Sequence, residues 1–109
     1  MRASNAWLAG ILIVLAAPLA WAEGSPDEGR ELADKLCKGC HVVGTENRHG
    51  GIDSTPSFFL MSDKIDDYRQ RLWTVTKRRP HIAYERLDDV SIDDIEHLIA
   101  YISRLERQK

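Results

Sequence analysis

The run Cys37-Lys38-Gly39-Cys40-His41 carries the residues of this chain that are best suited to chemistry. Two thiols three positions apart can add to the two vinyl groups of one haem, and the adjacent imidazole can supply a nitrogen ligand to the iron. This spacing is the attachment signature of a c-type haem. The sequence therefore predicts one covalent haem on Cys37 and Cys40, with His41 as the proximal iron ligand.

Two other uses of paired cysteines compete with the haem interpretation. A structural zinc site needs about four ligands, and the chain has no third cysteine. A thioredoxin-like dithiol is expected beside a βαβ pattern, and no such pattern is visible. Both alternatives, and chance, are less consistent with the sequence than a haem site.

The segment before the domain is typical of a secretory signal peptide, predicted over residues 1–22. Arg2 supplies the positive charge, residues 8–17 form an apolar run, and Ala20-Trp21-Ala22 is an A-x-A cleavage site. We expect cleavage after Ala22 and a mature domain over residues 23–109.

The predicted export agrees with the haem interpretation. Cysteine pairs outside the cytoplasm are open to disulfide formation, and covalent haem attachment takes place in that compartment. We therefore expect a periplasmic protein. An uncleaved membrane anchor over residues 6–22 is the alternative, because that segment approaches the length of a membrane span.

Charge and size narrow the class of protein. The net charge is −2, whereas a nucleic-acid-binding protein calls for a basic patch or a high pI. The chain length fits one small domain, a class that often needs a cofactor or cross-link for stability. Apart from the haem run, no nucleophile–base motif of an enzyme is present. We expect a monomer without nucleic-acid partners.

The elements that would position the haem run are predicted to be helical throughout. Ser25-Pro26-Asp27-Glu28 combines a capping serine, a proline suited to the first turn and a capping-box glutamate. A short helix is predicted over residues 57–62 and a longer one over residues 66–79, which Pro80 would end. The longer helix would share one face among Tyr68, Leu72, Val75 and Thr76.

The last helix has the clearest pattern. Ser91 is a predicted cap, and an apolar stripe follows at helical spacing. Residues 42–55 and 80–90 are predicted loops, and no strand alternation is visible. The fold class is therefore predicted to be all-α. The stripe consists of Ile92, Ile95, Leu98, Ile99, Ile102 and Leu105.

The layout resembles the small class I cytochromes c of bacteria over nearly all of residues 25–107. In that family a glycine eight residues before the first haem cysteine lies where the first and last helices cross, and Gly29 stands there. The run Ala100-Tyr101-Ile102-Ser103-Arg104-Leu105 matches the family's last helix. The resemblance implies an orthogonal helical fold around one haem, with the Pro56 carbonyl accepting the proximal imidazole N–H.

The second axial ligand is left open. In the resembling family it is usually a methionine in the loop before the last helix, and residues 80–90 contain no methionine. His81 is the first choice, followed by Met61 and by Tyr84, which takes the place of the family's methionine when the loop is aligned on His81. Aligned without a gap on the last helix, Glu85 takes that place instead. An open sixth site is a further option, with His49 the least favoured ligand.

Other polar residues near the expected site could each have an ordinary structural role or a role at the haem. The Trp73 indole could reach a haem propionate or belong to the core. The run Lys77-Arg78-Arg79 could complement a helix dipole, contact a propionate or dock a partner. His97 lies off the apolar stripe and is expected to face solvent.

These observations imply an electron carrier rather than an enzyme. The expected function is transfer of one electron between a donor and an acceptor protein by a periplasmic, monohaem c-type cytochrome that is not anchored in the membrane. The alternative is a haem protein whose open or weakly held sixth site binds or senses NO, CO or O2.

Overall fold

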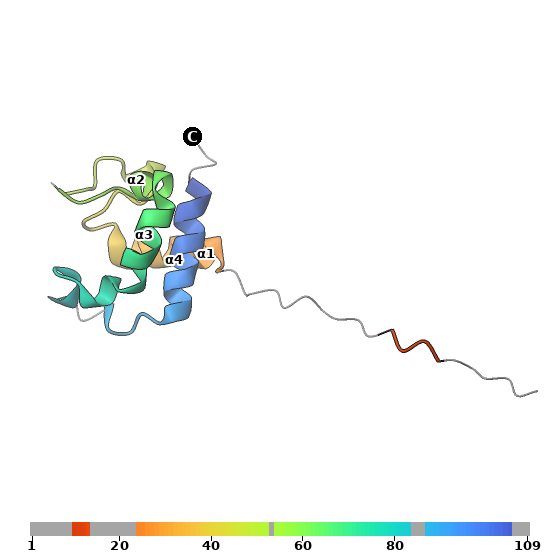
Figure 1. The fold of residues 1–109 in the computed structure, drawn as a ribbon. Coiled ribbons are helices and arrows are strands. Elements are labelled where there is room, and N and C mark those ends of the chain that lie inside the picture. Colours follow the sequence, from red (N-terminus) through yellow and green to blue (C-terminus); the bar gives the residue numbers. More distant parts are fainter. Residues whose placement is uncertain (1–9, 14–23, 53, 84–86, 106–109) are drawn as a thin grey trace, which may run out of the picture.

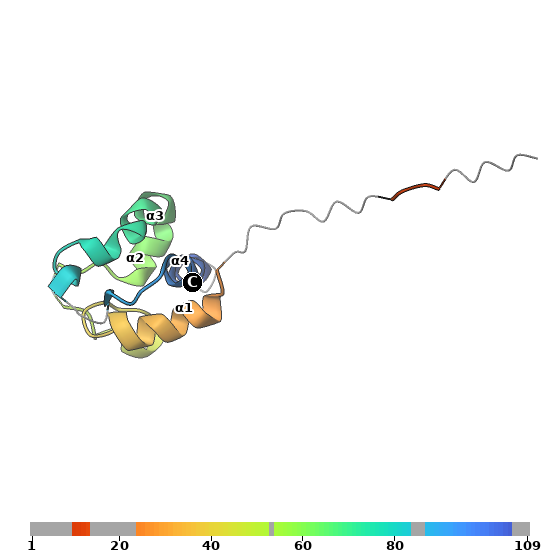
Figure 2. The same cartoon turned by 90° about the horizontal axis from the view of Figure 1, so that it is seen from below.

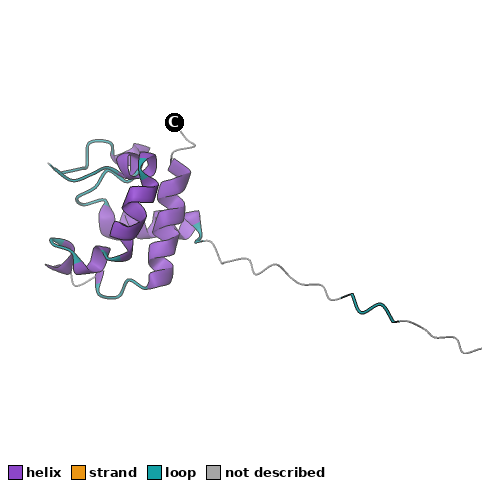
Figure 3. Cartoon of the chain, in the orientation of Figure 1, coloured by secondary structure: helices purple, strands orange, loops and turns teal. Residues whose placement is uncertain are grey.

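The computed structural model describes residues 10–13, 24–52, 54–83 and 87–105. Every regular element in these ranges is a helix, as Figure 3 shows. The prediction of an all-α fold class is therefore confirmed for the described part of the chain. The α-helices are α1 (Pro26–Leu32), α2 (Phe58–Asp63), α3 (Ile65–Trp73) and α4 (Ile92–Leu105).

Shorter helical turns join these elements. A π-helical turn, Ala33–Cys37, continues α1 to Cys37. Turns of 3-10 helix lie at Thr45–Asn47, Val75–Lys77 and His81–Ala83. Two of the three 3-10 turns lie within the predicted loops 42–55 and 80–90.

Three serines start the helices by the same local mechanism. Ser25 caps α1, Ser57 caps α2 and Ser91 caps α4, and each hydroxyl oxygen accepts the backbone N–H three residues further on. Such caps satisfy N–H groups that the helix itself leaves without partners. At α4 the bond is reciprocated, because Asp94 Oδ2 accepts the Ser91 N–H at 2.9 Å. The predicted caps Ser25 and Ser91 are confirmed.

The first helix lies across the last one, and Gly29 is at their contact. Figures 1 and 2 show α1 crossing α4 in two views related by a quarter turn. A Cβ added at Gly29 would lie 2.0 Å from the His97 carbonyl oxygen and 2.8 Å from the Tyr101 Cβ. Only a residue without a side chain permits this approach. The contact of Gly29 with Tyr101 is the one that the resemblance implies.

The expectation that His97 faces solvent is wrong. Its Nδ1 accepts the Ser25 backbone N–H at 2.8 Å, and its Nε2 lies 2.7 Å from Glu28 Oε2. His97 therefore takes the place that the predicted capping box gave to Glu28, whose carboxylate pairs with the imidazole instead. The side chain is only 23% exposed, because the crossing α1 covers it.

The predicted helix over residues 66–79 is too long. In the structure α3 ends at Trp73, and Thr74 leaves helical geometry with φ −114° and ψ 15°. Thr74, Val75 and Thr76 are three successive β-branched residues, which disfavour an α-helix. The end is therefore set by these residues, seven positions before Pro80.

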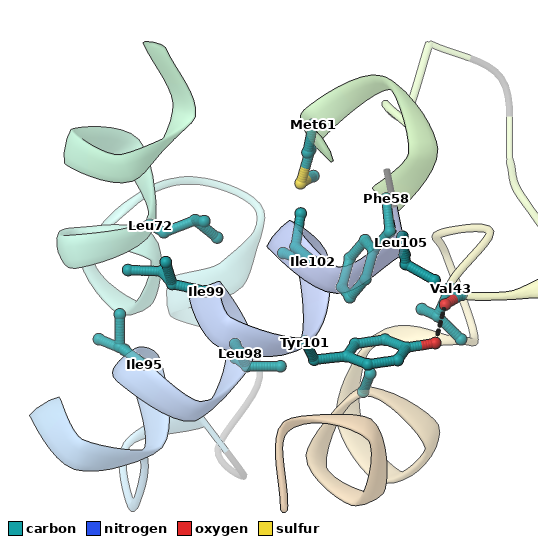
Figure 4. Close-up of a cluster of buried hydrophobic side chains, with 11 residues drawn as sticks. Val43, Phe58, Met61, Leu72, Ile95, Leu98, Ile99, Tyr101, Ile102 and Leu105 are labelled. Carbon is teal, nitrogen blue, oxygen red and sulfur yellow. Dashed lines mark hydrogen bonds between the residues drawn. The ribbon is translucent and has the colours of Figure 1, made fainter. Parts of the chain in front are cut away.

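The core gathers on the buried face of α4. Figure 4 shows this face between α2, α3 and the segment that carries Val43. The Tyr101 hydroxyl donates to the Val43 carbonyl, and its ring lies 6.3 Å from the Phe58 ring. The predicted apolar stripe is buried from Ile95 to Leu105, but Ile92 is 59% exposed. The stripe thus begins one turn later than predicted.

The predicted signal peptide lies mostly outside the described residues. Within it the structure describes only residues 10–13, and Ile11, Leu12 and Ile13 are all exposed. None of the described helices combines the length and the apolar composition that a membrane crossing requires.

Candidate functional site

A tight turn presents the two cysteines and the histidine of the haem run. The Cys37 carbonyl accepts the backbone N–H groups of Cys40 at 3.2 Å and His41 at 2.9 Å. The π-helical turn before Cys37 leads directly into this arrangement. As a result Cys37, Cys40 and His41 all line the same cavity.

The His41 ring is oriented by the chain that follows it. Its Nδ1 lies 2.7 Å from the Pro56 carbonyl oxygen. A carbonyl only accepts, so Nδ1 carries the proton and Nε2 is left with a lone pair. The Phe58 ring packs at 5.7 Å between ring centres. This hydrogen bond is the one implied for Pro56, and it is of the kind that orients metal-binding imidazoles.

Asn47 holds the backbone behind the haem run, a role that the sequence interpretation missed. Its Oδ1 accepts the N–H groups of Val43 at 2.9 Å and Gly44 at 3.1 Å, and its Nδ2 donates to the His41 carbonyl at 2.9 Å. Asparagine commonly bonds nearby backbone groups in turns. That preference was visible in the sequence, but the contact with His41 was not.

Replacing Asn47 by alanine is expected to destabilise the domain by about 2–3 kcal/mol, because three hydrogen bonds of about 1 kcal/mol each are lost. Denaturant unfolding followed by circular dichroism measures the change. Asn47→Asp keeps both acceptor contacts and loses only the donor to His41, so we expect a smaller loss. Equal losses for the two variants would show that the contact with His41 dominates.

The cavity is mainly apolar and measures about 310 Å³, at the small end of the range usual for ligand sites. Its walls come from the haem run, the chain around Pro56, and helices α2 and α3. Apolar walls exclude water and favour a flat hydrophobic ligand. The apolar lining residues are Leu36, Ile52, Pro56, Met61, Leu72, Pro80 and Leu87.

His81 lines the same cavity and is parallel to His41. The two ring centres are 6.1 Å apart and the planes differ by 6°. Two imidazole nitrogens that share one metal at about 2 Å each give ring centres about 6 Å apart. In addition, His81 Nδ1 is buried and finds no hydrogen-bond partner among the described residues. The ring separation is thus compatible with two imidazoles that share one metal.

Burial shifts the pKa values of two lining residues, Cys37 and His81. Burial, and then the neighbouring Cys40, raise the pKa of the Cys37 thiol to about 12. A dithiol redox catalyst instead needs a thiolate at neutral pH. Burial, and then the nearby His41, lower the pKa of His81. His81 is therefore held in the neutral form, which is the form that binds metals.

The other candidate residues differ in their exposure and in whether they line the cavity. Met61 lines the cavity but is 6% exposed and belongs to the core cluster, where Figure 4 shows it beside Ile102. His49 is exposed and does not line the cavity. Trp73 is 39% exposed and does not line the cavity. Tyr84 lies outside the described residues.

The charged groups among the described lining residues are all positive. Arg71 of α3 and Arg78 and Arg79 of the following segment line the cavity, and none of the lining residues that the structure describes is acidic. Two of these arginines come from the basic run singled out in the sequence. Guanidinium groups pair well with carboxylates, so the cavity suits an apolar ligand that carries carboxylates.

Within the described ranges, no three His, Cys, Asp or Glu side chains gather closely enough to hold a metal ion together. A four-ligand zinc site therefore finds no support there. The cavity instead brings together two thiols, two parallel imidazoles and three guanidiniums around apolar walls, which are the kinds of group that a covalently held metalloporphyrin would need.

No family model matches the chain, and comparison with curated proteins and with solved structures finds no match either. Its function is therefore inferred from the residues that line this cavity.

Proposed function

We propose that this chain is a monohaem c-type cytochrome that carries one electron between protein partners. The observation that supports this most is the pair of parallel imidazoles, His41 and His81, 6.1 Å apart in the cavity that Cys37 and Cys40 also line. These are the only two histidines among the described residues that line this cavity.

Each residue of the site would have a defined task. The Cys37 and Cys40 sulfurs would each form one thioether bond. His41 would bind the iron through Nε2, because its Nδ1 proton is held by the Pro56 carbonyl at 2.7 Å. His81 would supply the second nitrogen ligand. The haem supplies one-electron chemistry at its iron.

The chain would hold the iron ligands in position and exclude water from them. His41 is held by Pro56 and packed against Phe58, so its ring needs no rearrangement between oxidation states. The apolar walls keep water from the ligands, and the helical scaffold stays in place while the charge of the site changes. Pre-set ligands of this kind suit fast electron exchange, whereas catalysis would need an open coordination position.

The proposal includes export. Residues 1–22 would act as a signal peptide that is removed after Ala22, and residues 23–109 would form the mature domain in the periplasm. The C-x-x-C-H run and the A-x-A cleavage site support each other, since covalent haem attachment takes place outside the cytoplasm. Donor and acceptor would both be redox proteins that meet the domain in that compartment.

The test is the attachment itself. The chain is co-expressed with a haem-attachment system and extracted with acid–acetone. We expect the haem to remain on the peptide, and peptide mass to place it on residues 37–41. Cys37→Ala and Cys40→Ala should each keep at most one thioether and lower the holoprotein yield sharply. Haem that extracts freely from the wild-type protein would sink the proposal.

A further inference from the structure

We propose that the redox partner of this protein binds over the cavity mouth with a face rich in carboxylates. This inference rests on the proposed function, since it names the partner of the same site. It is carried by the contrast between the charge of the whole chain and the charge around the cavity.

The chain as a whole is acidic, with a net charge of −2. The described part of the cavity lining has the opposite sign, because its charged members are Arg71, Arg78 and Arg79. All three are exposed, so their charge reaches the solvent in front of the cavity. Lys77 precedes them on the same segment and is exposed as well. Local charge of this kind steers an approaching partner independently of net charge.

Two of the three guanidiniums are held in place. Arg78 Nε donates to Thr74 Oγ1 at 2.9 Å. Arg71 lies over the Tyr68 ring, 5.3 Å from its centre. Side chains held before binding lose less entropy when a partner pairs with them. The arginines around the cavity therefore form a prepared surface for anionic groups.

The two carboxylates of a haem would not pair with all of these cations. Two propionates neutralise at most two of the four cations on the segment from Arg71 to Arg79. Asp88 and Asp89 follow the lining residue Leu87 but do not line the cavity themselves. At least two cations of this segment are thus left for a partner.

Apolar side chains are exposed beside these charges. Ile52 lines the cavity and is 56% exposed, and Ile82, next to His81, is 49% exposed. An apolar centre with a polar rim is the usual anatomy of a protein interface. Here the rim is basic, so the complementary partner surface is acidic.

The test measures electron transfer from the ferrous holoprotein to two small oxidants of opposite charge. The probes are hexacyanoferrate(III), an anion, and tris(phenanthroline)cobalt(III), a cation, followed by stopped flow. We expect the rate with the anion to fall about tenfold as ionic strength rises from about 0.01 M to about 0.5 M. The rate with the cation should not fall. The net charge of −2 predicts the opposite for both probes.

Matched variants locate the effect. Arg78→Gln and Arg79→Gln should each lower the rate with the anion about two- to threefold at low ionic strength. Arg69→Gln removes the same charge from an exposed position of α3 that does not line the cavity, and it should leave the rate unchanged. An equal loss in Arg69→Gln, or a rate with the anion that rises with salt, would overturn the acidic-partner inference alone. A protein without covalent haem would overturn the proposed function, and this inference with it.

Discussion

In the proposed haem protein, His81→Ala is expected to turn the haem from low-spin to high-spin and to let the ferrous form bind CO. The reason is that His81 lies parallel to His41 at a ring separation of 6.1 Å, and alanine offers no donor in its place. The optical spectrum of both oxidation states, before and after CO is added, measures the change. Wild-type protein should be low-spin and should not respond to CO.

Three further variants separate the possible distal ligands. His81→Met should restore a low-spin haem and raise the reduction potential by on the order of 0.1 V, since methionine ligation raises it. Met61→Leu should leave the wild-type spectrum almost unchanged if Met61 only packs in the core. Tyr84→Phe should also be silent. A far-red sulfur–iron band in wild type that vanishes in Met61→Leu would refute the His81 assignment.

A high-spin wild-type spectrum would have a different meaning. CO binding without any substitution would show an open or weakly held sixth site. That result would move the protein from the electron carriers to the gas-binding haem proteins, while leaving Cys37, Cys40 and His41 in their roles.

Gly29→Val is expected to destabilise the domain by about 3 kcal/mol, the upper part of the usual range for overpacking. The added Cβ would lie 2.0 Å from the His97 carbonyl oxygen and 2.6 Å from its carbon. These are backbone atoms of α4, so the two helices must separate. For a domain of this size the loss corresponds to a fall in melting temperature of about 12–24 °C. Thermal unfolding followed by circular dichroism measures it.

Two alanine variants serve as controls for this prediction. Gly29→Ala adds only the clashing Cβ and gains about 1 kcal/mol in helix propensity, so any net loss reports the clash. Gly39→Ala adds the same atom where nothing lies within 4 Å, and it should change stability by less than about 0.5 kcal/mol. If Gly29→Val were as stable as wild type, Gly29 would not lie at the crossing.

The sequence alone determined those features that depend on neighbours a few positions apart. The caps at Ser25 and Ser91 could be predicted because a serine hydroxyl and the N–H three residues on belong to one turn. The stripe from Ile95 to Leu105 could be predicted because helical periodicity selects one face. The end of α3 was predicted at Pro80, although its cause is the local β-branched run at 74–76.

The tertiary structure decided which distant residues meet. His41 and His81 are forty positions apart, and Ser25 and His97 are 72 apart. No repeating sequence pattern links residues at these separations, so the sequence alone could not pair them. His81 reaches His41 because the chain after α3 returns to the cavity, and His97 is covered because α1 crosses α4 at Gly29. The kinds of residue in the site thus follow from the sequence, whereas helix packing brings these residues together around one cavity.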